Sequence, residues 1–220
     1  MKRFVKMCMI AASLTLSGAA AKSEDISPEI VETVARASDL FWIDNQAKTA
    51  WDLLETLGDT PYTELYTLRA FIIASGQLSG GFDRCAAILN AERAAERGNM
   101  MPAYGLLRGL YEGEWISIAA LEGSRIALFF KGYRLLTTDR YPNALAMFDN
   151  ERPLRDAAPY LYLSAELGHE PAIRQIRALE RDHPGIYSRN NYSDAIDAYT
   201  PIEIYCPPRA YEKGDVNWQN

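Results

Sequence analysis

A phrase of two small residues, two variable positions and a glycine occurs three times in this chain. It reads AAERG at residues 94–98, AALEG at 119–123 and SAELG at 164–168. Each copy is followed four or five residues later by another alanine. Small residues on a helix that stops at a glycine are typical of a tight turn into a second helix. Three such turns predict that the chain stacks pairs of antiparallel helices into an α-solenoid.

Helical periodicity extends over most of the chain, and Ser27-Pro28 and Thr60-Pro61 are typical helix openings. Strict apolar–polar alternation is confined to residues 202–205, where we expect either one short strand or a tail lying in a groove. The sequence therefore predicts an all-α fold with an irregular C-terminal tail. The expected helices lie at residues 28–41, 47–57, 61–76, 83–97, 102–111, 115–121, 124–135, 153–167 and 170–181, with further helices beginning at 143 and at 194.

A second motif follows the first copy of the phrase, because Ala103, Leu107 and Tyr111 form one helical stripe that ends at Gly113. This combination resembles the Sel1-like repeat, a relative of the tetratricopeptide repeat. That family's unit opens A-x-x-x-L-G-x-x-Y-x-x-G and ends K-A-A-x-x-G. The resemblance covers about residues 83–182, and it implies an α-solenoid that binds other proteins. The alternative is a helical bundle without repeats.

The match to the family pattern is uneven along the repeats. Ala172 and Ile176 repeat the opening more weakly than the first unit does. Arginine replaces the family's glycine after the leucine at Arg108 and at Arg177, whereas Gly132 retains it in the middle unit. The substitutions imply looser helix pairs in the first and last units than in the family norm.

The first 21 residues have the features of a secretory signal peptide. Basic residues at positions 2, 3 and 6 precede an apolar run at 7–16 and small residues at 17–21. We expect cleavage near Ala21 and a periplasmic or secreted mature protein. The alternative is a membrane anchor, but the run is about half of the roughly 20 residues that a spanning helix needs. The expected organisation is thus a signal peptide at 1–21, N-terminal helices at 22–82, repeats at 83–182 and a mostly irregular segment at 183–220.

The chain is acidic, with a formal net charge of -6 at pH 7. An acidic surface repels phosphate backbones, which excludes nucleic acid as an expected partner. After the signal peptide, the sequence contains no apolar segment of membrane-spanning length, so we expect no membrane insertion.

Two cysteines follow the signal peptide, Cys85 and Cys206. In an oxidising compartment such a pair is expected to form a disulfide that ties the C-terminal tail to a helix of the first half. The alternative is two buried, unpaired thiols.

The sequence offers few residues suited to catalysis. His169 and His183 have no metal-ligand spacing, and serine nucleophile and phosphate-loop motifs are missing. We therefore expect no metal, no cofactor and no catalytic residues. Glu112 and Glu114 beside Tyr111 form a combination that would suit sugar binding, so an enzyme acting on cell-wall or extracellular glycans is the alternative function.

The stripe next to the packing alanines is the candidate binding surface. It carries Tyr104 and Arg108 after Pro102, and Ile173 and Arg177 after Gly168. Tyrosine and arginine are enriched where binding energy concentrates. We expect these four residues to line a groove for a protein or peptide partner, which makes the protein an interaction adaptor. Ordinary solvated helix faces, or a surface for self-association, are the alternatives.

Overall fold

The computed structural model describes residues 26–137, 151–183 and 187–209, and the side chains of 151–154 are not described. Over these ranges the chain is all-α and contains no strand. The predicted signal peptide at 1–21 and the helix expected to begin at 143 lie outside the described residues. The helices are α1 (Pro28–Trp42), α2 (Ala47–Glu55), α3 (Thr63–Ala74), α4 (Arg84–Glu96), α5 (Met100–Leu110), α6 (Trp115–Leu121), α7 (Arg125–Thr137), α8 (Glu151–Glu166), α9 (Glu170–Asp182) and α10 (Ser193–Asp197), with a 3₁₀ turn η1 (Arg189–Tyr192).

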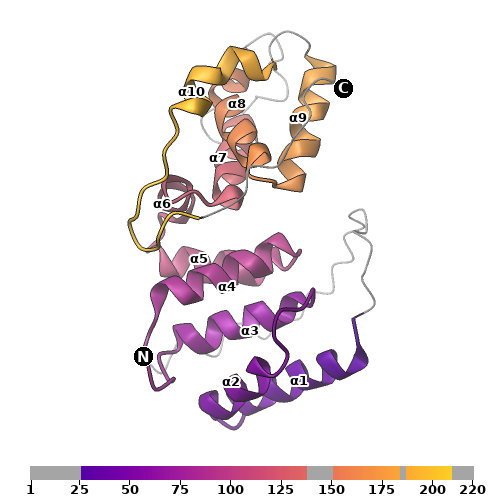
Figure 1. Cartoon of the computed structure of the whole chain (residues 1–220), viewed down its shortest axis with the longest axis vertical. Coiled ribbons are helices and arrows are strands. Elements are labelled where there is room, and N and C mark those ends of the chain that lie inside the picture. The colour runs from indigo at the N-terminus through magenta and orange to yellow at the C-terminus, as the bar shows by residue number, and fades with distance from the viewer. Residues whose placement is uncertain (1–25, 138–150, 184–186, 210–220) are drawn as a thin grey trace.

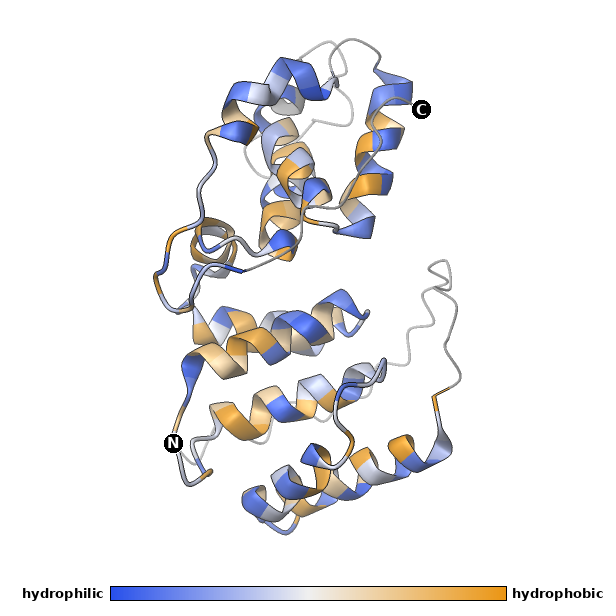
Figure 2. Cartoon of the chain, viewed as in Figure 1, coloured by the Kyte–Doolittle hydropathy of each residue, from blue (hydrophilic) through white to orange (hydrophobic). Residues whose placement is uncertain are grey.

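The helices follow one another along the long axis of the molecule, from α1 and α2 at one end to α8, α9 and α10 at the other (Figure 1). The most extensive contacts join helices that are neighbours in sequence, namely α1 with α2, α3 with α4, α4 with α5, and α6 through α9 in succession. Apolar residues lie largely on the parts of each helix that face neighbouring helices (Figure 2). One core cluster runs from Val34 on α1 to Ile196 on α10, so the N-terminal helices share a core with the helices that follow residue 83.

The three repeated phrases form the same helix-ending turn. Gly98, Gly123 and Gly168 all have positive φ, at 106°, 87° and 78°. In each turn the N–H of the residue after the glycine donates to the carbonyl five positions earlier, at 3.0 Å, 2.9 Å and 3.1 Å. The glycine N–H also donates three positions back, which completes a Schellman motif. The turns predicted from the phrase are therefore present at α4–α5, α6–α7 and α8–α9.

Substitution of Gly98 by alanine isolates the backbone requirement of this turn. A Cβ added at Gly98 meets no atom within 4 Å, so the cost comes from the positive φ alone. We expect Gly98→Ala to lower the free energy of unfolding by about 1 kcal/mol. Urea denaturation measures the change. An unchanged midpoint would show that the turn tolerates a side chain, contrary to this interpretation.

Gly132 on α7 has a different role, because it lies against α8. A Cβ there would fall 2.7 Å from Cγ of Leu161 and 3.1 Å from the carbonyl oxygen of Ala157. Two helices can approach this closely only where a side chain is missing. Gly132 is thus a packing glycine.

The structure bears on the two alternatives that the sequence left open for residues 202–205, a short strand or a tail lying in a groove. Residues 202–205 form no strand but lie, without regular structure, along the α6–α7 turn. The short strand is therefore excluded, and the tail in a groove stays a prediction. The 3₁₀ turn η1 was not predicted, and it precedes α10 near the expected short helix at 194. Among the described helices, none is both long and apolar enough to cross a bilayer.

Candidate functional site

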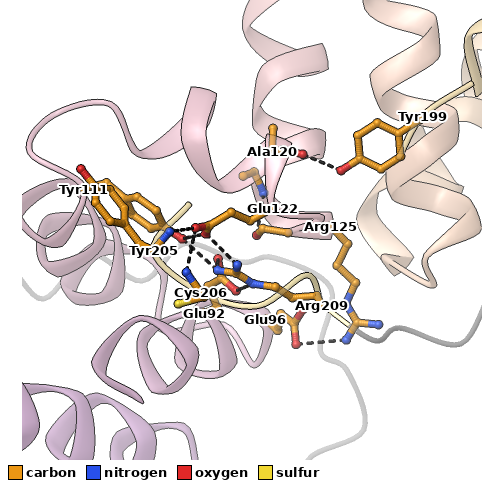
Figure 3. A network of polar contacts seen from close by, with 12 residues as sticks. Glu92, Glu96, Tyr111, Ala120, Glu122, Arg125, Tyr199, Tyr205, Cys206 and Arg209 are labelled. Carbon is orange, nitrogen blue, oxygen red and sulfur yellow. Dashed lines mark hydrogen bonds and ion pairs between the residues drawn. The ribbon is translucent and has the colours of Figure 1, made fainter. Parts of the chain in front are cut away.

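The segment at residues 199–209 lies across the end of α6 and is held there through its backbone (Figure 3). The N–H of Ile202 donates to the carbonyl of Leu121 at 2.9 Å, and the N–H of Arg209 donates to the carbonyl of Glu122 at 3.1 Å. The hydroxyl of Tyr199 donates to the carbonyl of Ala120 at 2.5 Å. The last carbonyls of a helix have no partner within the helix, and the looped segment satisfies those of α6 here.

Glu122, in a variable position of the second phrase, is the centre of this contact. Its side chain is fully buried. Oε1 accepts from the N–H groups of Tyr205 and Cys206, and Oε2 accepts from the hydroxyl of Tyr111 and from the guanidinium of Arg209, both at 2.7 Å. Burial by itself raises the pKa of the carboxyl, but these hydrogen bonds outweigh it, and the pKa of Glu122 is lowered. Glu122 is therefore an ionised acceptor for four donors.

Arg209 places its guanidinium between two buried carboxylates. Nη1 donates to Glu122, while Nε and Nη2 donate to the two oxygens of Glu92 at 3.2 Å and 3.1 Å. Nη2 also donates to the hydroxyl of Tyr111 at 2.8 Å. The side chains of Arg209 and Glu92 are each 3% exposed. A planar fork with five N–H donors is the group that suits such bidentate contacts.

The two carboxyls differ in their electrostatic environment. Burial is the largest influence on Glu92 and raises its pKa, although the charge and hydrogen bonds of Arg209 act in the opposite direction. Two carboxylates share one cation, so Glu92 is the member of the pair that takes up a proton more readily. The site is thus built around a positive charge that the C-terminal segment supplies.

A second ion pair links this site to the next hairpin. Arg125, at the start of α7, donates to both oxygens of Glu96 at 2.6 Å and 3.0 Å and to the carbonyl of Leu167 at 3.1 Å. One arginine therefore connects the end of α4, the start of α7 and the α8–α9 turn. Positions of three successive turns are fixed relative to one another by this contact.

A polar cavity of about 460 Å³ adjoins the segment on the side of α4. Pro207, Pro208 and Leu89 line it together with seven charged side chains. These charged residues are Asp59, Glu92, Arg93, Glu96, Arg97, Arg125 and Arg209. The surface beside the bound segment is thus hollow and rich in groups that pair with a peptide backbone or charged side chains.

The structure brings the two cysteines together. Cys206 is buried, Cys85 is half-buried at the start of α4, and both are free thiols. Burial raises the pKa of Cys206, and a hydrogen bond with the Cys85 side chain raises it further. The side chains of Cys85 on α4 and Cys206 in the C-terminal segment are therefore in contact. The disulfide itself stays a prediction.

Alkylation of the protein tests this disulfide. In an oxidised sample we expect Cys85 and Cys206 to resist alkylation until a reductant is added, with a mass lower by two hydrogens than the reduced chain. Mass spectrometry of a tryptic digest should then find the two cysteine peptides linked. Alkylation of both thiols without reductant in a sample purified from an oxidising compartment would exclude the bridge.

The four predicted binding residues lie on two separate hairpins. Tyr104 on α5 is half-buried, with its ring edge-on to Trp115 at 5.0 Å. Ile173 on α9 is 9% exposed and packs in a small cluster with Phe129. Arg108 and Arg177 are exposed on α5 and α9. The two arginines are thus available to a partner, while Ile173 belongs to the core, and the role of this surface stays a prediction.

The acidic residues that would suit glycan chemistry are exposed. Glu112, which has a positive φ of 54°, forms an ion pair with Arg84 at 3.2 Å, and Glu114 is exposed beside it. In the described ranges, the chain holds no group of histidine, cysteine and carboxylate side chains suitable for a metal ion.

The sequence interpretation missed Glu92, Glu122 and Arg209. No local signal distinguished Glu122, because the other two copies of the phrase also contain a glutamate, Glu96 and Glu166. Its partners lie too far along the chain for a local pattern to connect them. Comparison of the chain with protein-family models, curated proteins and solved structures gave no match.

Proposed function

We propose that this protein is an exported interaction adaptor, which binds a protein or peptide partner in the groove of an array of Sel1-like antiparallel helix pairs at residues 83–182. The observation that carries the proposal is the mode in which residues 199–209 are held. A looped segment covers the end of α6, satisfies free carbonyls there and inserts an arginine between two carboxylates. Stacked helical repeats commonly present extended surfaces that bind partners.

Two further features support a binding role. The cavity beside the segment is lined by both acidic and basic side chains, which favours a polar peptide over an apolar one. Arg108 and Arg177 are exposed on separate hairpins of the same array, and arginine is among the residues that contribute most at interfaces. A partner that extends along the array would contact both.

Charge reversal of the exposed arginines tests the proposed binding surface. We expect Arg108→Glu combined with Arg177→Glu to weaken partner capture from an envelope extract by about tenfold or more, because each hot-spot arginine is worth more than about 1 kcal/mol. Arg36→Glu on α1 reverses an exposed charge outside the repeats and is the control. Capture is measured by quantitative mass spectrometry of affinity-purified protein.

The outcomes separate the possible functions. A stoichiometric partner that is lost only from the double variant supports the adaptor. Equal partner capture by the double variant and by Arg36→Glu would show that Arg108 and Arg177 do not contribute to the binding surface. Turnover of peptidoglycan fragments by the purified chain would favour the glycan enzyme instead.

A further inference from the structure

The cavity of about 460 Å³ beside Pro207 and Pro208 holds more positive than negative charge. Its seven charged side chains comprise four arginines and three carboxylates. The whole chain, in contrast, has a formal net charge of -6. A local excess of cations in an acidic protein attracts an anion to that place, and cavities of about 300–1,000 Å³ commonly hold ligands.

The excess charge belongs to Arg93 on α4, because each carboxylate that lines the cavity is already paired with another arginine. Among the described residues, the exposed guanidinium of Arg93 has neither a carboxylate partner nor a hydrogen-bond acceptor. The pairs that account for the remaining charges are Arg209 with Glu92 at 3.1 Å, Arg125 with Glu96 at 2.6 Å and Arg97 with Asp59 at 3.6 Å (Figure 3 shows the first two).

An aromatic ring holds Arg93 beside a second cation. Cζ of Arg93 lies 5.9 Å and Cζ of Arg97 lies 4.4 Å from the centroid of the buried Tyr66 ring. Arg97 also donates to the carbonyl of Thr60, which fixes its place. These cation–π contacts orient both guanidiniums in advance, which lowers the entropic cost of binding an anion.

The two arginines repel each other in this position. Arg93 lies in the last turn of α4 and Arg97 at its C-cap, four residues apart, a spacing at which like charges destabilise a helix. The helix end contributes only about half a negative charge, which is less than the charge of the two guanidiniums. A carboxylate between them would relieve the repulsion.

A third arginine adds to the positive charge around this ring. Cζ of Arg69 lies 5.9 Å from the centroid of Tyr66, and its ion pair with Glu55 is long, at 3.7 Å. Burial lowers the pKa of Arg69, and the positive charge of Arg93 acts in the same direction, against the influence of Glu55 and Asp59. The charge of Arg93 is therefore unfavourable to its neighbours until an anion compensates it.

From these contacts we infer that the cavity anchors the partner of the proposed adaptor by a carboxylate, which Arg93 binds with the help of Arg97. The inference rests on the proposed function and adds the chemistry of the partner. The planar guanidinium of Arg93 presents donors that match the two oxygens of a carboxylate. An acidic side chain and a chain terminus both offer this group.

Titration of the full chain with short peptides tests the inference, with the Nε–Hε resonances of the arginines observed by NMR. Acetylated tetraglutamate amide carries side-chain carboxylates, acetylated tetraalanine with a free C-terminus carries a terminal one, and acetylated tetraglutamine amide carries none. At least one of the first two peptides should bind and shift the Arg93 resonance, whereas the glutamine peptide should not. The peptide that binds more tightly identifies the source of the carboxylate.

Substitution of Arg93 by glutamine should weaken binding of the carboxylate peptide by about fivefold, because one exposed charge contact is lost. Arg93→Lys keeps the charge without the planar fork, so its affinity should lie between those of the original chain and Arg93→Gln. Arg36→Gln is the matched control, since it removes an exposed charge on α1 that does not line the cavity, and it should leave the affinity unchanged.

The outcomes distinguish this inference from the proposed function. Equal affinity of the Arg93→Gln and Arg36→Gln variants, equal binding of the glutamine peptide, or no shift of the Arg93 resonance would overturn the carboxylate site. If circular dichroism shows that Arg93→Gln is unfolded, the comparison of Arg93→Lys with Arg36→Gln decides. Unchanged partner capture by Arg108→Glu with Arg177→Glu, while tetraglutamate still binds at Arg93, would instead remove the proposed surface and leave the carboxylate site in place.

Discussion

Replacement of Arg209 by methionine is expected to lower the free energy of unfolding by about 3–5 kcal/mol, because it leaves two buried carboxylates without their cation. The side chains of Glu92 and Glu122 are 3% and 0% exposed, so water cannot replace the guanidinium. Methionine keeps much of the volume of the side chain and isolates the loss of charge. Urea denaturation followed by circular dichroism measures the change.

A second arginine supplies a control for Arg209→Met, and substitution of the two glutamates supplies a rescue. Arg181 is 74% exposed in its pair with Asp182, so Arg181→Met removes an ion pair without stranding a buried charge and should leave stability unchanged. Adding Glu92→Gln and Glu122→Gln to Arg209→Met should restore much of the lost stability, since neutral amides do not repel each other. Equal stability of the Arg209 and Arg181 variants would contradict the assigned role of the network.

The Arg209→Met defect should also depend on pH. Burial already raises the pKa of Glu92 in the folded protein, and loss of the guanidinium removes the main influence that lowers it. A carboxyl whose folded pKa lies above its unfolded value of about 4.3 gives its full stability below that pH and loses it as the pH rises through the folded pKa. The variant is therefore expected to be least defective near pH 4 and most defective above neutrality. Combining Arg209→Met with Glu92→Gln should reduce this dependence.

Local features of the fold followed from the sequence, and long-range ones did not. The three turns were predictable because a Schellman motif involves six consecutive residues and requires a glycine, both of which a short phrase reveals. The role of Glu122 could not be predicted in this way, because its partner Arg209 lies 87 residues further along the chain. Within its own phrase, Glu122 resembles any solvated residue at a helix end.

The burial of Ile173, which the sequence placed on a binding surface, likewise depends on a contact that is distant in the sequence. Ile173 was assigned to a binding stripe from the spacing of α9 alone. It is buried because Phe129 of α7 lies against the small cluster of Ala165, Ala172 and Ile173. Helical periodicity shows which residues share a face, but the neighbour that covers the face depends on how three helices pack. The contact of Cys85 with Cys206, in contrast, was anticipated from composition and compartment rather than from any local pattern.

Gly132→Ala should lower the free energy of unfolding by about 2–3 kcal/mol, as expected for overpacking of a core contact. The added Cβ would lie 2.7 Å from Cγ of Leu161, a side chain that is itself fully buried, and 3.1 Å from a backbone oxygen of α8. Neither atom is the free end of a flexible side chain, so α7 and α8 must separate. Thermal and urea denaturation both measure the loss.

The sign of the stability change separates two effects of replacing a helical glycine by alanine. A clash with a neighbouring helix lowers stability, whereas the higher helix propensity of alanine raises it. Gly105 and Gly109 are also helical glycines, but an added Cβ meets nothing within 4 Å at either position. Gly105→Ala and Gly109→Ala should therefore raise stability by about 0.5–1 kcal/mol each, because alanine restricts the unfolded chain and favours the helix. Leu161→Ala in the Gly132→Ala background should cost less than Leu161→Ala alone, since the two substitutions share one space. Stabilisation by all three glycine substitutions would show that α7 and α8 are not in close contact at Gly132.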